Sequence, residues 1–299
     1  METLEQLQNR IASYKDLRSI VRTMKALSAV SIRQYEQAVR SLSDYYRTIE
    51  LGLHVVIRTM GKPVPPQRRK RQKILTAAIV FGSDHGLCGR FNEDIASHAL
   101  ERLRAISADP QQRRVLAVGS RVAAHLEHGG QSTEEDFLTP GSAARITATV
   151  QQILMKIDEW QAEGHALSVY LFYNRHLSGS NYRSTGTQLL PIDLDSLYRL
   201  EKEKQEWPFR TLPTFTIDRQ RLFSSLLRQY IFVSIFRACA ESLASEHASR
   251  LAAMQAAEKN LEERFDEVTG QYRRLRQDVI TGELLDVVAG FETLTGGAS

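Results

Sequence analysis

The chain has 299 residues, of which 42% are hydrophobic and 25% charged, and its formal net charge is +4. This composition predicts a folded protein of one large or two modest domains, excludes a disordered chain, and argues against nucleic acid as a partner. No apolar stretch reaches the roughly 18 residues of a membrane span, and the two cysteines, Cys88 and Cys239, have no metal-ligand spacing, so we expect a cytoplasmic protein without disulfides.

The first expected element is a helix over residues 1–60. Glycine and proline are absent between Glu2 and Leu51, and apolar side chains recur there at spacings of three and four residues. The members of this apolar stripe are Leu4, Leu7, Ile11, Tyr14, Leu17, Val21, Met24 and Leu27. Such a stripe predicts a helix that packs along a second helix.

Residues 61–73 are expected to form a linker. Pro63, Pro65 and Pro66 exclude a helix, and a basic run, Arg68 to Lys73, follows them. This run has two interpretations. It is either a solvated linker or an electrostatic contact with anionic lipid or an acidic partner near a membrane.

Residues 74–213 predict an α/β domain, because apolar strand patterns alternate with helical patterns. Strands are expected at 74–81, 114–119 and 166–174, helices at 92–104, 120–127 and 143–163, a polar turn at 179–186 and an exposed loop at 193–204. Strands of this kind, apolar on both faces, are typical of a mostly parallel sheet.

The first of these strands runs into a turn that contains Gly82, Gly86 and Gly89. The spacing of these glycines fits neither a dinucleotide fingerprint nor a phosphate-binding loop, and no Lys-Ser or Lys-Thr pair follows. A structural turn is therefore the favoured interpretation, with phosphate binding as the alternative. Histidines and cysteines show no metal-ligand spacing, and no Ser-His-Asp pattern is present, so we expect no catalytic residue, cofactor or metal.

Residues 214–299 predict a second long helix. The stretch from Leu222 to Gly290 lacks proline and contains only Gly270 and Gly282 as interior glycines. Alanines recur in it at every fourth residue, namely Ala240, Ala244, Ala248, Ala252 and Ala256. Because small residues allow a close approach, this helix is expected to pair with the first one as an antiparallel coiled coil, although a helix inside a bundle would show the same periodicity.

Three motifs, in order along nearly the whole chain, resemble those of the gamma subunit of F-type rotary ATP synthases. They are Asn9–Ile11 with Ile20–Ala29, Ser83–Asn92, and Ser245–Met254 with Gln271–Thr281. The chain departs from the family pattern at His85, Arg90, Phe91 and Gly282. These departures suggest a divergent branch, such as an alternate or sodium-translocating type.

The resemblance implies a Rossmann-like middle domain that binds no nucleotide and a non-catalytic chain that acts as a central rotor shaft. This shaft would couple ion-driven rotation of a membrane c-ring to ATP synthesis or hydrolysis on alpha and beta subunits. The implied partners are the hexameric alpha/beta ring, the epsilon subunit and the c-ring. The implied location is peripheral, on the cytoplasmic face of the cell inner membrane, and the coupling ion, H+ or Na+, is set by other subunits.

The resemblance also implies roles for individual residues. Contacts with the beta catch loops and the ring fall on Arg276, Gln277, Thr281, Glu283, Val287 and Val288, and packing between the rotor helices falls on Met24, Ala244, Ala248 and Ala252. Phe291 and Leu294 would complete an apolar tip, although local packing would also explain Val287 and Val288. Gly282 is expected to loosen the helix around it.

Two other classes of protein remain as alternatives. A coiled-coil structural adaptor would share the long helices, but it has no reason to interrupt them with an α/β domain. A Rossmann-type enzyme would need a phosphate-binding turn and an acidic partner for the ribose.

Overall fold

The computed structural model describes residues 2–60, 74–163, 166–177, 179, 181–192 and 214–295. The expected linker at 61–73 and the expected loop at 193–204 lie outside these residues. The chain forms two compact units, one made of residues 1–27 and 251–299 and the other of residues 28–250. The two long helices that the apolar and alanine stripes predicted are α1 (Leu4–Met60) and α6 (Arg219–Thr295). Each of them contributes to both units.

The unit of residues 28–250 contains a five-stranded sheet in the order β3-β2-β1-β4-β5. Its strands are β1 (Ile74–Phe81), β2 (Arg113–Val118), β3 (Glu135–Phe137), β4 (Ala166–His176) and β5 (Tyr182–Leu190). β1 pairs in parallel with β2 and β4, and β2 pairs in parallel with β3. Only the β4–β5 pair is antiparallel among these pairs, which confirms the mostly parallel sheet.

The polar turn expected at 179–186 is wrong from Tyr182 onward, because β5 begins there. β5 is an edge strand with a polar sequence that includes Gly186, so it shows no apolar strand pattern. Its conformation comes from pairing along β4, a tertiary effect that overrides weak local preference. The short edge strand β3 also escaped prediction.

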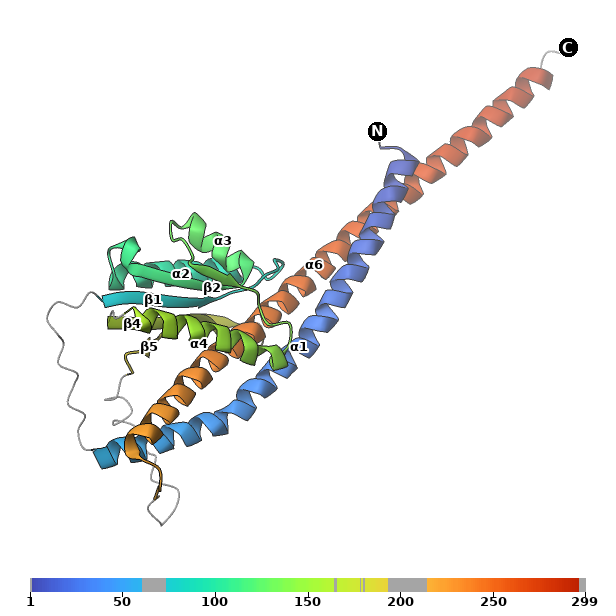
Figure 1. Cartoon of the computed structure of the whole chain (residues 1–299). Helices are drawn as coiled ribbons and strands as arrows, with labels where there is room; N and C mark the ends of the chain where they lie inside the picture. Colours follow the sequence, from blue (N-terminus) through green and yellow to red (C-terminus); the bar gives the residue numbers. More distant parts are fainter. Residues whose placement is uncertain are drawn as a thin grey trace. The chain divides into compact units, whose positions relative to one another are not determined.

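Helices cover both faces of the sheet (Figure 1). Helices α2 (Phe91–Ile106) and α3 (Ser120–His128) pack on one face, and α4 (Ile146–Ala162) and α6 pack on the other. Short 3-10 turns, η1 (Pro110–Gln112) and η2 (Ala143–Arg145), precede β2 and α4. Alternate residues of β1 enter opposite cores, with Ala78 and Val80 facing α2 and α3 and Ile79 facing α4 and α6.

In the unit of residues 1–27 and 251–299, α1 and α6 run antiparallel. Arg18 contacts Glu262 at 2.7 Å and Arg22 contacts Glu258 at 2.9 Å. Residue numbers therefore rise along α1 while those of the contacting residues fall along α6. Lys25 also contacts Glu258. Partly exposed ion pairs of this kind contribute only about 0–1 kcal/mol each. The buried apolar side chains of the unit, Leu7, Val21, Met254 and Val268, therefore supply most of its stability.

The close packing after β1 generates a test of this fold. A Cβ at Gly82 would overlap the side chain of Val122 and lie 2.7 Å from Asn92 Oδ1, so Gly82→Ala should destabilise the chain by about 1–3 kcal/mol. A Cβ at Gly86, in the same turn, would meet no atom within 4 Å. Thermal unfolding should therefore show a lower Tm for Gly82→Ala and an almost unchanged Tm for Gly86→Ala, and equal melting temperatures would contradict the packing.

Candidate functional site

One face of α6 supplies hydrogen-bond donors to the carboxyl edge of the sheet. Ser242 Oγ donates to the carbonyl oxygen of Phe81, the last residue of β1, at 3.3 Å. Ser245 Oγ donates at 2.8 Å to the carbonyl oxygen of Asn174, near the end of β4, and it also lies 2.9 Å from the carbonyl oxygen of Glu241 in its own helix. Both serines are buried. The helix therefore holds the ends of two neighbouring strands through its hydroxyl groups.

The next turn of α6 holds the glycine-rich turn in the same way. Ser249 Oγ donates to the carbonyl oxygen of Cys88 at 2.6 Å. Arg250 Nη2 donates to the carbonyl oxygens of His85 and Gly86 at 3.1 and 3.4 Å. We name this set of α6 donors the edge clamp, and it consists of Ser242, Ser245, Ser249 and Arg250.

The glycine-rich turn is also closed by its own side chains. Ser83 N donates to Asn92 Oδ1 at 2.9 Å, and Asn92 Nδ2 donates to Ser83 Oγ at 2.8 Å. Asp84 accepts hydrogen bonds from the backbone N–H groups of Ser120, at the start of α3, and Thr139. In a phosphate-binding loop such N–H groups would point at the ligand. Here the N–H groups of Ser83, Ser120 and Thr139 donate to the side chains of Asn92 and Asp84 instead, which supports the interpretation of a structural turn.

The electrostatics of the clamp centre on a buried ion pair. Glu246 Oε1 lies 2.8 Å from Arg250 Nη1, and both side chains are less than 10% exposed. Burial raises the pKa of Glu246 to about 7, although Arg250 opposes this shift. Glu246 Oε2 and Arg250 Nε are buried without a hydrogen-bond partner in the described part of the chain. Arg250 therefore connects the helix to the turn, and Glu246 supplies its counter-charge from the same helix. The cost of removing both charges from water is only partly offset.

His247 lies beside this pair as a packed neutral residue. Its ring stacks on Tyr35 of α1 with centroids 5.6 Å apart, and burial lowers the pKa of His247 to about 4. Tyr35 Oη donates to the carbonyl oxygen of Pro140 at 3.0 Å, and burial raises the pKa of Tyr35 to about 12. The family resemblance implies a structural or coupling role for His247, and a ring packed in this way fits a structural one.

The four residues expected to pack the helices divide between the two units. Ala244 and Ala248 are buried in the unit of residues 28–250, and Ala244 lies in the core shared by the sheet, α4 and α6. Met24 and Ala252 belong to the other unit and are partly buried. The alanine stripe predicted packing against another helix. It did not predict that Ala244 would pack against the sheet.

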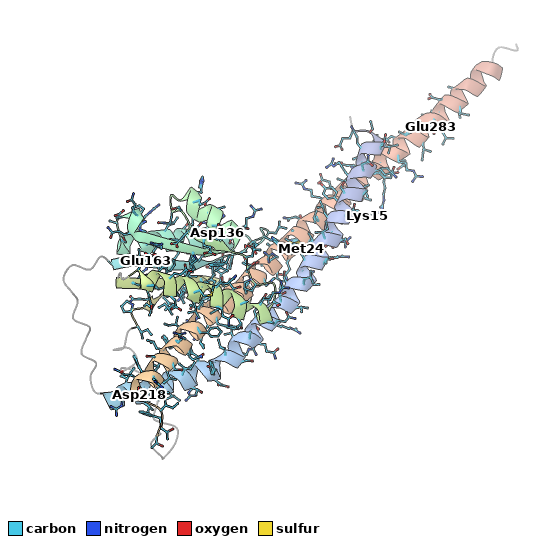
Figure 2. All side chains as sticks on the ribbon, viewed as in Figure 1. Lys15, Met24, Asp136, Glu163, Asp218 and Glu283 are labelled. Carbon is cyan, nitrogen blue, oxygen red and sulfur yellow. The ribbon has the colours of Figure 1, made fainter. Side chains whose placement is uncertain are left out.

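The expected partner-contact residues lie on the C-terminal part of α6. Arg276, Gln277, Thr281, Glu283, Val287 and Val288 are all exposed. Figure 2 shows Glu283 on the part of α6 that extends past the N-terminal end of α1. Other exposed apolar residues surround them, namely Val279, Ile280, Leu284 and Leu285. So much apolar surface on one helix is typical of a surface that a partner covers. The side chains of Phe291 and Leu294 lie outside the described residues.

The edge clamp was missed by the sequence analysis. Its signal is a pattern of serines at 242, 245 and 249, which places three hydroxyls on one face of an alanine-rich helix.

Within the described ranges, no group of three or more His, Cys, Asp or Glu residues could hold a metal ion. None of the described helices is long and apolar enough to cross a membrane.

Comparison with known proteins extends over nearly the whole chain. A family model described as ATP synthase matches residues 3–294. The ATP synthase gamma chain of Geobacter metallireducens is 30% identical over 304 residues, which cover 99% of this chain and 100% of that one. The ATP synthase gamma chain of Ralstonia nicotianae is 26% identical, with 97% and 99% of the two chains covered.

Solved structures share the fold at lower sequence identity. A chain of the Euglena gracilis mitochondrial ATP synthase rotor superposes with a TM-score of 0.61 at 17% identity, covering 93% of this chain and 98% of that one. A chain of the Tetrahymena thermophila mitochondrial ATP synthase central stalk and c-ring superposes with a TM-score of 0.54 at 18% identity, covering 80% and 99%.

The pKa of His247 predicts how stability depends on pH. Because the folded pKa of about 4 lies below the ordinary value of 6.5, the unfolded chain binds this proton first. Stability from His247 is therefore complete above about pH 6.5 and is lost toward pH 4, by up to about 3 kcal/mol. Urea unfolding of the unmodified chain and of His247→Gln should show a difference in stability that shrinks as the pH falls through this range.

Glu246→Gln should show the opposite dependence. The folded pKa of Glu246 is raised from 4.5 to about 7, so the folded chain binds the proton first and this group gains stability as the pH falls from 7 to 4.5. Relative to Glu246→Gln, the unmodified chain should become more stable over that range. A difference that is independent of pH in both variants would contradict the buried environment assigned to these side chains.

Gly282 provides a test on the exposed part of α6. A Cβ at Gly282 would meet no atom within 4 Å, so Gly282→Ala should stabilise the surrounding turn by about 1 kcal/mol. Amide exchange of residues 278–286 should slow about fivefold. Gly270→Ala is the matched control, because a Cβ there is equally unobstructed and should slow exchange only around residue 270. Unchanged exchange in both variants would show that the glycines do not loosen the helix.

Proposed function

The chain belongs to the ATP synthase gamma-chain family, and we propose that it carries torque as the central rotor shaft of an F-type ATP synthase. In this role it couples rotation of the membrane c-ring to ATP synthesis or hydrolysis on the alpha and beta subunits. Gamma chains are non-catalytic subunits of the complex. The observation that carries the proposal is the continuity of α6, which supplies both the clamp on the sheet and the exposed surface from Arg276 to Val288.

The proposed partners follow from the family and from the proteins that share its fold. One of these is a chain of the Euglena gracilis mitochondrial ATP synthase, described with its OSCP, F1 and c-ring, at a TM-score of 0.62. We assign to this chain the alpha/beta ring, the epsilon subunit and the c-ring as partners. Association with the membrane is peripheral, through the complex, and we place it on the cytoplasmic face of the cell inner membrane.

We assign the parts of the chain to the tasks of a shaft. Residues 1–60 and 214–299 are assigned to the helical shaft, of which the unit of residues 1–27 and 251–299 would stand in the alpha/beta ring. Residues 74–213 are assigned to the body beside epsilon and the c-ring, with residues 61–73 as the linker. The membrane subunits choose the coupling ion, proton or sodium.

The exposed C-terminal part of α6 is proposed to meet the ring. Arg276, Gln277, Thr281 and Glu283 are polar and exposed, as contacts to the beta catch loops require. Val287 and Val288 are 70% and 51% exposed, so an apolar sleeve would remove a large apolar area from water. This hydrophobic gain would hold the tip of the shaft laterally while leaving it free to turn, because such contacts are non-directional.

Reconstitution tests this function. Mixing the chain with alpha and beta subunits from the same source should give a single complex that hydrolyses ATP, whereas the chain alone should not hydrolyse it. Arg276→Ala should lower the hydrolysis rate several-fold, about 1–2 kcal/mol, without releasing the chain from the complex. Arg264→Ala is the control, because Arg264 is exposed and paired with Glu267 on its own helix.

Two results would contradict the proposal. The first is a chain that remains free when the alpha/beta ring forms. The second is nucleotide binding by the isolated chain, which would direct attention to the turn at Gly82.

A further inference from the structure

We propose that the edge clamp is the junction through which torque passes between α6 and the sheet, so that weakening it uncouples ion movement from ATP hydrolysis. This inference rests on the rotor function proposed above and adds the residues that transmit the load. It follows from where the four donors lie, what they contact, and what the rest of the interface is made of.

The clamp reaches three separate segments of the α/β unit from one face of α6. Ser242 contacts the end of β1, Ser245 contacts the end of β4, and Ser249 contacts the glycine-rich turn. Spacings of three and four residues place these hydroxyls within about 60° of one another around the helix axis. A rotation of α6 about its axis would therefore strain all three hydrogen bonds together.

The apolar part of the same interface is interlocked only in places. Ile235 and Leu243 of α6 fill the core against the sheet, whereas Ala240 and Ala244 present almost smooth surfaces near the serines. Apolar contacts of this kind resist separation, but they are non-directional and do not fix a sliding position. Hydrogen bonds weaken steeply when their angle falls away from linear. Where α6 presents alanines, the hydroxyl groups are therefore the directional contacts that resist a tangential load, in addition to the packing of the larger side chains.

Burial makes these hydrogen bonds hard to exchange for water. Ser242 is 1% exposed and Ser245 is 0% exposed. If α6 slipped, the carbonyl oxygens of Phe81 and Asn174 would lose a donor in a place that solvent does not reach, and an unsatisfied buried acceptor is costly. The slipped arrangement is therefore disfavoured, which gives the junction one preferred register.

Arg250 adds a charged contact at the end of the series. Its guanidinium group donates to the carbonyl oxygens of His85 and Gly86 while Glu246 supplies the counter-charge. Hydrogen bonds from a charged donor are roughly twice as strong as neutral ones. The clamp therefore combines two fully buried hydroxyl contacts and a part-buried one along one stripe, together with charged hydrogen bonds from the neighbouring Arg250.

The test separates hydrolysis from ion movement. The complete complex, with epsilon and the membrane subunits, is placed in lipid vesicles with the chain unmodified or carrying Ser242→Ala, Ser245→Ala and Ser249→Ala together. ATP hydrolysis is measured alongside the membrane potential reported by a voltage-sensitive dye, which responds to transported protons and sodium ions alike. We expect assembly and hydrolysis to persist while the potential per ATP falls about threefold or more, because three hydrogen bonds are lost.

Matched variants identify the cause. Ser234→Ala removes a hydroxyl that donates to the carbonyl oxygen of Tyr230 in the same helix at 2.7 Å, so it should leave the potential per ATP unchanged. Ser249 is only partly buried, so Ser249→Ala alone should fold normally and lower the ratio by a smaller factor. Ser249→Thr keeps the hydroxyl and should restore the ratio.

The outcomes are distinguishable. An unchanged potential per ATP in the triple variant and in Ser249→Ala has two meanings, which the hydrolysis rate separates. If hydrolysis falls with the potential, the serines serve stability alone, and if hydrolysis is unchanged, torque passes elsewhere. Either result would overturn the inference. If the complex with the unmodified chain neither hydrolyses ATP nor builds a potential, the rotor function itself is wrong.

Discussion

The carbonyl groups at the carboxyl edge of the sheet need hydrogen-bond donors, and α6 supplies them. In open α/β sheets this edge is where ligands usually bind. Here Ser242, Ser245 and Arg250 occupy it from within the same chain. A fold widely used to bind nucleotides is thereby converted into a body fixed to a helix, which explains how a Rossmann-like domain can serve a chain whose task is mechanical.

The same constraint separates the rotor from its alternatives. A coiled-coil adaptor needs no buried polar contact between a helix and a sheet, and a Rossmann-type enzyme needs its carboxyl edge open. This chain has the buried polar contact and a covered edge, and it matches an ATP synthase gamma chain over 99% of its length. Its buried polar groups fix one relative position of helix and sheet, while the exposed apolar residues of α6, such as Leu284 and Val287, remain available for a partner.

The sequence predicted those parts of the fold whose signal is local. β1 was found because its residues are apolar on both faces, and α1 and α6 were found because nothing interrupts their periodicity. β5 was missed because pairing with β4, and not its polar sequence, makes it a strand. The clamp was missed because the sequence of a helix does not show which distant carbonyl groups its side chains will contact in the folded protein. Serines in an alanine helix are ambiguous until Phe81 and Asn174 are seen beside them.

Rotation of the sheet with the shaft tests the central claim most directly. Both native cysteines are buried, whereas Met155 on α4 is 61% exposed, so Met155→Cys provides a single reactive site for a bead. With the alpha/beta ring fixed to a surface, the account predicts that ATP makes the bead turn continuously in one direction. Hydrolysis without rotation of the bead would contradict it, because the sheet would then not move with the helix that turns in the ring.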